Sequence, residues 1–263
     1  MDTQAVLDLM KDVAAQVITP RFRSLTSGEV MEKNPGDLVT VADREAEVLL
    51  TQALTADDPT VLVVGEEATS ADRALLDRLA DADHAYTVDP VDGTKNFVHG
   101  RAEHAVMVSE LRHGEVVRGW IWQPELGSAY VVERGAGAYR DGQRLHPPCP
   151  ADQDYGLTDL RVLTSRPASE GTYGDLAVGP TAWCCGVDYP WLITGVAHAV
   201  MYTNSYPWDH GPGSLFVEEL GGVIRRPDRS RYLTRHYHPS GLLVAMSPHI
   251  WDTIATHLDG TLR

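Results

Sequence analysis

The sequence predicts a mixed fold of the α+β or α/β class, in which helices cover β-sheets. Residues 3–18 place apolar side chains on one face at helical spacing, whereas residues 104–134 alternate like antiparallel strands. After residue 150, strand-like and helix-like segments take turns. With 263 residues, of which 43% are hydrophobic, the chain suffices for one large domain or two closely packed ones.

In the first half, an amphipathic helix is expected to end at Pro20, and a polar segment over 28–37 follows it. Because proline donates no hydrogen bond to a strand ladder, Asp89-Pro90 is expected to end a buried strand. The elements predicted before residue 100 are a helix over 41–55, a strand over 61–64, a short helix over 71–80 and the buried strand over 85–88.

An antiparallel meander is predicted over 104–111, 116–123 and 129–134, because hairpin turn signals join these segments. The proline-rich run 146–150 is the clearest compositional break, so it separates an N-terminal half, 1–146, from a C-terminal half, 147–263. The elements predicted beyond it are strand-like runs at 161–164 and 181–187, a helix near 189–199, a helix that opens at Trp208-Asp209 and ends at Gly221-Gly222, a strand at 242–246, and a helix from Ser247 to Gly260.

The composition argues against some classes of function. A formal net charge of −15, with no run of Lys or Arg, disfavours sequence-independent binding to nucleic acid or to an anionic membrane. The three cysteines show neither metal-ligand spacing nor an even disulfide framework, which favours reduced thiols. No apolar run approaches membrane length and the N-terminus lacks the pattern of a signal peptide, so a soluble cytoplasmic protein is expected.

The stretch 87–97, TVDPVDGTKNF, joins the end of the buried strand to two carboxylates, a glycine and a hydroxyl. Gly93 permits a close approach of backbone to ligand. The amides of Gly93, Thr94 and Lys95 form a cradle for an anion if a short helix starts there. Two carboxylates beside an anion cradle are chemically reasonable when cations lie between them.

Acidic residues stand at the ends of apolar elements in three separate segments: Glu66-Glu67, Asp89 with Asp92, and Asp209. Taken singly, each has a simple alternative as a surface residue, a turn residue or a helix cap. Taken together, they are expected to converge at one end of a sheet. Carboxylates without imidazole or thiolate neighbours indicate Mg²⁺, and a pair of such ions suits phosphate ester hydrolysis.

Asp43 and Thr94 form a second predicted group. Thr94 is placed to orient a water molecule, and Asp43 is placed to accept a proton through Thr94 if the two side chains meet. The alternative for Asp43 is a capping carboxylate, because it lies three residues after Thr40 in the first turn of a predicted helix.

These motifs occur in the order and spacing of one known family. The chain resembles the inositol monophosphatases, Mg²⁺-dependent and Li⁺-sensitive phosphatases related to fructose-1,6-bisphosphatase. The resemblance implies a layered αβαβα sandwich, with an antiparallel-sheet N-terminal half and a mixed-sheet C-terminal half, and a homodimer. The matching motifs are DLVTVAD at 37–43, GEE at 65–67, DPVDGTKNFVHG at 89–100, GAGAYRDGQRL at 135–145 and WDHGPGSLFVEELGG at 208–222.

The resemblance also implies a role for each motif. Asp43 with Thr94, or Glu66 through a further metal, would help to activate water for attack on a small phosphomonoester. Two or three Mg²⁺ ions are expected, with Mn²⁺ as a substitute and Asp89 bridging two ions. The metal ligands would be Glu66, Asp89, the Val91 carbonyl, Asp92 and Asp209. The residues that bind substrate would be Asp92, Gly93, Thr94, Asp188 and Asp209.

Departures from the family's pattern concern the substrate. Tyr202 stands where inositol phosphatases often carry a glutamate, and Cys184-Cys185 opens a segment that replaces a step of small residues. Asp188 is interpreted either as a partner of a substrate hydroxyl or amine, or as a helix N-cap. Inositol monophosphate or a related polyol or sugar phosphate is the leading substrate. Histidinol phosphate, fructose 1,6-bisphosphate and a 3′-phosphoadenosine nucleotide are alternatives on the same scaffold, and a noncatalytic metal- or phosphate-binding protein is the alternative of another class.

Overall fold

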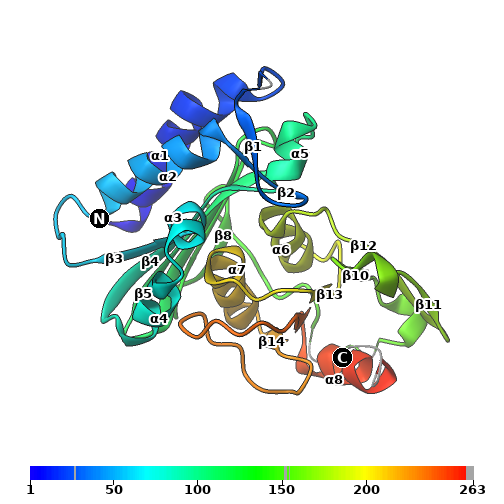
Figure 1. The fold of residues 1–263 in the computed structure, drawn as a ribbon. Coiled ribbons are helices and arrows are strands. Elements are labelled where there is room, and N and C mark those ends of the chain that lie inside the picture. Colours follow the sequence, from blue (N-terminus) through cyan, green and yellow to red (C-terminus); the bar gives the residue numbers. More distant parts are fainter. Residues whose placement is uncertain (27, 151–152, 154, 259–263) are drawn as a thin grey trace.

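The computed structural model describes residues 1–258 except 27, 151–152 and 154, and its elements stack in five layers (Figure 1). Helices α1 (Thr3–Val13) and α2 (Val41–Leu54) cover one face of a seven-stranded sheet. Helices α6 (Cys185–Ile193) and α7 (Pro207–Glu219) lie between it and a six-stranded sheet, whose outer face packs on α8 (Pro248–His257). The predicted αβαβα sandwich is confirmed.

The seven-stranded sheet contains the predicted meander. Its order is β3-β4-β5-β6-β7-β8-β9, with β3 parallel to β4 and all later pairs antiparallel. Short helices α3 (Glu66–Ala71), α4 (Ala74–Asp81) and α5 (Thr94–Val98) lie in the connections. The strands are β3 (Leu62–Gly65), β4 (His84–Asp92), β5 (Ala105–Arg112), β6 (Glu115–Gln123), β7 (Ser128–Glu133), β8 (Gly137–Arg140) and β9 (Gln143–Arg144).

The six-stranded sheet is mixed, as predicted for the second half. Its order is β11-β12-β10-β13-β15-β14; β10 is parallel to β12 and β13, and the other pairs are antiparallel. The strands are β10 (Val162–Thr164), β11 (Gly171–Tyr173), β12 (Leu176–Pro180), β13 (Ala199–Tyr202), β14 (Val223–Arg225) and β15 (Leu242–Ala245).

Two apolar cores result from the alternation of side chains along the strands. On β5, Val106 and Val108 face the core beneath α1 and α2, which also holds Met10 and Trp120. Their neighbour Met107 faces the larger core that extends through α6 and α7 to the second sheet. The C-terminal end of β4, which carries Asp89 and Asp92, therefore lies between these two cores.

Strand β4 continues four residues beyond its predicted end at Val88, so the expectation that Asp89-Pro90 stops it was wrong. The partner on one side, β3, ends at Gly65 opposite Val88, so a residue without an N–H is tolerated beyond that point. On the other side, the register with β5 shifts between Asp89 and Asp92, as at a bulge. Proline thus redirects the strand without terminating it.

Four other expectations differ from the structure. The polar segment 28–37 contains most of a hairpin, β1 (Val30–Asn34) and β2 (Asp37–Thr40), for which no apolar pattern was visible. Glu66-Glu67, read singly as surface residues, open helix α3. The run 181–187 is not a strand, because the helix expected near 189–199 begins at Cys185. Strands β11 and β12 were missed because both are short. The predicted end of the last helix, Gly260, lies outside the described residues.

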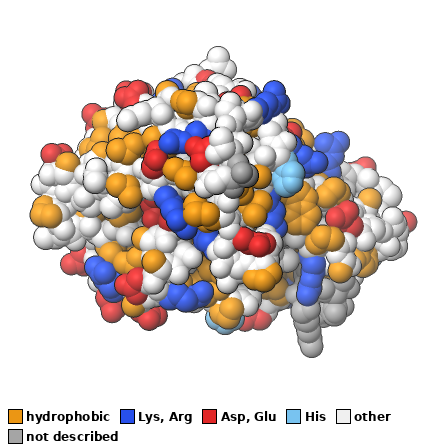
Figure 2. Space-filling model, turned by 45° about the horizontal axis from the view of Figure 1, so that its top comes forward, with side chains coloured by type: hydrophobic (Ala, Val, Ile, Leu, Met, Phe, Trp, Pro, Cys, Tyr) orange, Lys and Arg blue, Asp and Glu red, His pale blue; other side chains and the backbone are white. Residues whose placement is uncertain are grey.

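None of the helices in the described residues is long and apolar enough to cross a membrane. On the face shown in Figure 2, acidic and basic side chains are interspersed, in keeping with a sequence that has no run of Lys or Arg.

Candidate metal centre

Four elements bring acidic side chains to one place between the sheet and α7. Asp43 comes from the first turn of α2, Glu66 from the start of α3, and Asp209 from the first turn of α7. The end of β4 contributes Asp89 and Asp92, whose exposed fractions are only 1% and 8%. The predicted convergence of the three acidic segments is present in the structure: the charges of Glu66, Asp92, Asp209 and Asp43 all act on Asp89.

Asp89 is the centre of this group. Burial, followed by the charges of Glu66 and Asp92, raises the pKa of its carboxyl well above the usual range. Its Oδ1 is buried and has no hydrogen-bond partner among the described residues. Burial likewise raises the pKa of Asp209 well above the usual range. Several acids with an orphaned oxygen form a donor set that suits a hard divalent cation.

Lys33 on β1 supplies a cation at the edge of the cluster. Its Nζ lies 2.6 Å from Glu66 Oε1 and 2.8 Å from Glu67 Oε1. Burial acts to lower the pKa of Lys33, but the attraction of Glu66 and Glu67 outweighs it and the pKa is raised. Burial also raises the pKa of Glu66 to about 8, although Lys33 opposes this shift. One ammonium does not balance the whole group of acids.

Asp43 makes the contacts that both of the roles considered for it require. Its Oδ2 accepts hydrogen bonds from the backbone N–H and hydroxyl of Thr40, which completes a capping box at the start of α2. Its Oδ1 lies 3.1 Å from Thr94 Oγ1, which lies 3.0 Å from the Val91 carbonyl oxygen. Burial raises the pKa of Asp43 to about 6. The carboxylate is therefore mostly ionised at pH 7 and can accept a proton from Thr94.

Gly93 stands at the turn predicted to form an anion cradle. Its φ of +80° is accessible to glycine without strain, and helix α5 begins directly after it at Thr94. A Cβ at this position would lie 2.9 Å from the Glu103 carbonyl oxygen and 3.0 Å from Cys184 Cβ. The structure thus supports both predictions for this turn, a glycine conformation and a short helix.

The segment that departs from the family's pattern contacts Asp92. Cys184 Sγ lies 2.9 Å from Asp92 Oδ2, and the Gly186 N–H donates to the same oxygen at 2.5 Å. Burial raises the pKa of the Cys184 thiol well above its usual range, so Cys184 donates as a neutral thiol. Asp92 is thereby oriented by the turn that begins helix α6.

Asp188 does not cap this helix. The N-cap is Cys184, and Asp188 lies in the first turn, where its Oδ1 accepts a hydrogen bond from the Ala182 N–H at 2.8 Å. Its side chain is 1% exposed. The helix-cap interpretation of Asp188 was wrong, and the carboxylate holds the turn at 182 in place.

Tyr202 and His210 belong to a buried aromatic group beside Asp209. The ring of Tyr202 stacks on Tyr189, with centroids 5.6 Å apart, and meets His210 edge-on at 4.7 Å. Both ring nitrogens of His210 are hydrogen-bonded: Nδ1 lies 2.9 Å from the Tyr189 hydroxyl, and Nε2 lies 3.0 Å from Asn204 Oδ1. Burial lowers the pKa of His210 to about 3, so the imidazole is neutral.

The expectation of acids without imidazole neighbours was wrong, because His210 lies beside Asp209, whereas the neighbouring cysteines are neutral thiols rather than thiolates. Ligand atoms of Cys185, Asp209 and His210 lie within 4.8 Å of one another. Both nitrogens of His210 already have partners, so this imidazole is not available to a metal in the observed geometry. The oxygen ligands remain the larger part of the donor set.

Glu47 is a site residue that the sequence interpretation missed. Its carboxylate accepts hydrogen bonds from the N–H groups of Glu67 and Ala68, both at 2.7 Å, and so caps helix α3 at Glu66. Burial raises its pKa to about 7. The sequence did contain a signal for Glu47: this acid directly follows Ala46 on the apolar face of α2 and lies one turn after Asp43.

Replacing Glu47 with alanine is expected to lower the free energy of unfolding by about 1–3 kcal/mol, because two partly buried N–H groups lose a charged acceptor. Chemical denaturation measures this loss. The matched control is Glu45→Ala, two residues earlier on α2, where only a surface ion pair with Arg21 is removed and the expected cost is below about 1 kcal/mol. Equal losses in both variants would contradict the capping role of Glu47.

A cleft of about 710 Å³ opens at the edge of the cluster, where Glu66 is the one clustered acid that lines it. Glu66, Gly93 and Thr94 line it from below, and the indole of Trp183, which is 44% exposed, lies on its wall. Trp183 has a φ of +59°, a conformation that is uncommon for a residue other than glycine. The cleft therefore joins the turn at Gly93 and Thr94, the predicted anion cradle, to an aromatic surface.

Comparison with known proteins agrees with this geometry. A model of the inositol monophosphatase family matches residues 2–260. An inositol-1-monophosphatase of Rhizobium meliloti is 28% identical over 84% of this chain and 85% of its own length. A histidinol-phosphatase of Chlorobaculum parvum is 28% identical over 84% of each chain. A crystal structure titled as an IMPase/NADP phosphatase with Mg²⁺ and phosphate has a TM-score of 0.77 at 19% identity, covering 97% of this chain and 92% of that one; it shares the fold.

Proposed function

Because the chain belongs to the inositol monophosphatase family, a family of phosphatases, we propose that it is a Mg²⁺-dependent phosphomonoesterase. The proposed substrate is a small polyol or sugar phosphate, with inositol monophosphate as the leading compound. The observation that carries the proposal is Asp89: a buried carboxylate with an unpartnered oxygen, placed among the four other acids of the cluster.

The proposed metal ligands are Glu66, Asp89, the Val91 carbonyl, Asp92 and Asp209. Two or three Mg²⁺ ions, or Mn²⁺ in their place, would supply positive charge for the phosphate oxygens and lower the pKa of water. Support comes from the oxygen-rich donor set and from the structural relative crystallised with Mg²⁺ and phosphate.

The chain's own groups would position the reactants. The amides of Gly93 and Thr94, at the start of α5, would donate hydrogen bonds to the phosphate. The Thr94 hydroxyl orients the attacking water and passes its proton to Asp43, which lies within hydrogen-bond distance and is mostly ionised at pH 7. Asp92, held by Cys184 and Gly186, and Asp209 would bind the alcohol side of the substrate. Asp188, buried against Ala182, would act on the substrate only by positioning this turn.

A substrate panel tests the proposed function. Phosphate release is measured from inositol, sugar, histidinol and 3′-phosphoadenosine phosphates, and from fructose 1,6-bisphosphate, with Mg²⁺ or with EDTA. Turnover of an inositol or sugar phosphate that EDTA abolishes supports the proposal. Preference for histidinol phosphate, the substrate named for one relative, would change the proposed substrate from a polyol or sugar phosphate to histidinol phosphate. Metal binding without turnover of any compound would identify a noncatalytic binding protein.

The family resemblance extends the proposal to inhibition, assembly and location. We expect millimolar Li⁺ to inhibit the enzyme, a homodimer in light scattering, and a cytoplasmic protein divided into the halves 1–146 and 147–263. Full activity in millimolar Li⁺ would indicate an altered metal site.

The metal-free protein is expected to lose thermal stability as pH rises from 6.5 to 8.5. The pKa values of Glu47, about 7, and Glu66, about 8, exceed the usual carboxyl value, so folding favours their protonated forms. The stability that they contribute is complete at low pH and is lost as pH rises through these values. The window begins at pH 6.5 because of the buried His210, whose pKa is lowered. Below that pH, this group makes the protein more stable as pH rises, which opposes the effect of the two glutamates.

Thermal melts in EDTA and in Mg²⁺ check this dependence. Mg²⁺ is expected to raise the melting temperature most at pH 8.5, because it binds the ionised carboxylates. The variant Glu66→Gln should reduce the fall in EDTA. A melting temperature in EDTA that is constant or rises between pH 6.5 and 8.5 would contradict the assignment.

A further inference from the structure

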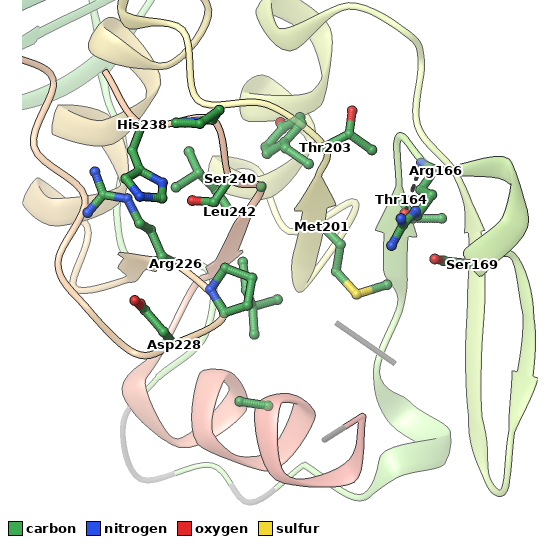
Figure 3. A pocket seen from close by; sticks show the side chains of 16 residues that line it. Thr164, Arg166, Ser169, Met201, Thr203, Arg226, Asp228, His238, Ser240 and Leu242 are labelled. Carbon is green, nitrogen blue, oxygen red and sulfur yellow. Dashed lines mark hydrogen bonds between the residues drawn. The ribbon is translucent and has the colours of Figure 1, made fainter. Parts of the chain in front are cut away.

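A second cavity, of about 660 Å³, lies at the six-stranded sheet beside α8 (Figure 3). Its walls come from the ends of β10 and β13, from the segment after β14, and from the segment before β15. None of the acids of the metal centre lines it. Its volume is within the range of pockets that hold metabolite-sized ligands.

The cavity is on the opposite face of β13 from the metal centre. Met201 points into it (Figure 3). Tyr202 also lines the cavity, but its ring packs on Tyr189 and His210 beside Asp209. Because adjacent side chains on a strand point to opposite faces, Met201 and the ring of Tyr202 lie on opposite faces of the sheet. A ligand that contacts Met201 therefore lies on the face of β13 opposite the ring of Tyr202, and it contacts none of the clustered acids.

Two arginines stand on opposite walls. Figure 3 shows Arg166 on one side and Arg226 with His238 on the other. The guanidinium of Arg226 donates to the carbonyl oxygens of Arg231 and His236, but its Nε is buried and unpartnered. Arg166 is exposed, and its guanidinium has no ion pair or hydrogen bond within the described part of the chain. The only acid on the walls is Asp228, which accepts hydrogen bonds from Ser230.

The remaining lining is amphipathic. Met201, Leu243 and Ala255 provide an apolar floor. The hydroxyl groups of Thr164, Thr203 and Ser240 lie around it, and the Ser240 Oγ is buried without a partner in the described residues. A buried hydroxyl and a buried guanidine N–H without partners, in one cavity, indicate polar groups that a ligand or water would satisfy.

We propose that this cavity is a second binding site, for a small organic anion with a planar or apolar body, such as an aromatic carboxylate or sulfonate. The two arginines on its walls attract the anionic group, and the apolar floor receives the body of the ligand. The site is independent of the proposed phosphatase function.

The test uses the anionic dye 8-anilinonaphthalene-1-sulfonate as probe, followed by fluorescence with the full-length protein. We expect saturable binding at one site. The variant Arg166→Gln should weaken it about fivefold or more, since a charge-assisted contact is lost. Ala255→Phe, which fills the floor, should abolish it. Arg78→Gln, at an exposed arginine on α4 outside the cavity, is the matched control and should bind like the wild type.

Two further measurements test the charge that the site prefers in a ligand and the location of the site. 1-Naphthoate should displace the probe at least about tenfold better than 1-naphthylmethylammonium, because the cavity carries more positive than negative charge. Phosphate with Mg²⁺ should not displace it, and Asp89→Asn should bind it normally. The proposal is overturned if the wild type shows no saturable binding, if Arg166→Gln and Arg78→Gln bind alike, or if phosphate with Mg²⁺ competes. Because Arg166 is exposed, that variant remains informative even if Ala255→Phe does not fold.

Discussion

Replacing Asp89 with asparagine is expected to lower kcat for phosphate release by about 10³-fold or more. The substitution preserves shape but removes the charge of the carboxylate whose Oδ1 has no protein partner and around which the other acids gather. Charge placed where a reaction needs it is commonly the largest single contribution to catalysis. Steady-state phosphate release on the best substrate of the panel measures the effect.

The same substitution should stabilise the metal-free protein. Asp89 is buried with like charges around it, so removing its charge relieves repulsion, and the melting temperature in EDTA is expected to rise. Asp83→Asn is the matched control, because its carboxylate is 93% exposed just before β4; it should change neither measurement. Turnover of Asp89→Asn near that of the wild type would refute the metal assignment.

Replacing Thr94 with valine is expected to lower kcat by about 10²-fold while leaving substrate affinity nearly unchanged. Valine keeps the shape and removes only the hydroxyl that lies between Asp43 Oδ1 and the Val91 carbonyl. Removal of a group that transfers a proton in the transition state typically costs about 10²–10⁴-fold. Because the effect is on the chemical step, kcat and kcat/KM should fall together.

Two variants make this prediction specific. Thr94→Ser keeps the hydroxyl and should retain most of the activity. Thr172→Val, at an exposed position on β11, is the control and should leave kcat unchanged. If Asp43 acts through Thr94, adding Asp43→Asn to Thr94→Val should cost little more than either change alone. Losses that multiply in the double variant would separate the two residues into independent roles.

Much of the candidate metal centre was predictable because its signals are local. Asp89, Asp92, Gly93 and Thr94 are adjacent in sequence, and the helix that begins after Gly93 has the predicted place. Helix α7 begins at Pro207, one residue before the predicted start at Trp208-Asp209. Spacing and turn chemistry act over a few residues, so a sequence carries this information directly.

The errors arose where distant residues decide the outcome. Pro90 sits inside a strand because β3 has already ended beside it, which depends on a segment more than twenty residues earlier. Glu47 is buried because its partners, the N–H groups at the start of α3, are twenty residues away. The Cys184 thiol reaches Asp92 from the second half of the chain. No local pattern describes such contacts.

By itself, the sequence determined the fold class, the order of the acidic motifs and the phosphate turn, since each follows from periodicity or from neighbouring residues. Only the tertiary structure decided that Asp43 both caps α2 and contacts Thr94, that His210 is a neutral, fully partnered imidazole, and that a cationic cavity lies behind β13. Burial and hydrogen-bond partners belong to the packed chain: desolvation sets these pKa values and sheet pleating sets which side chains share a cavity.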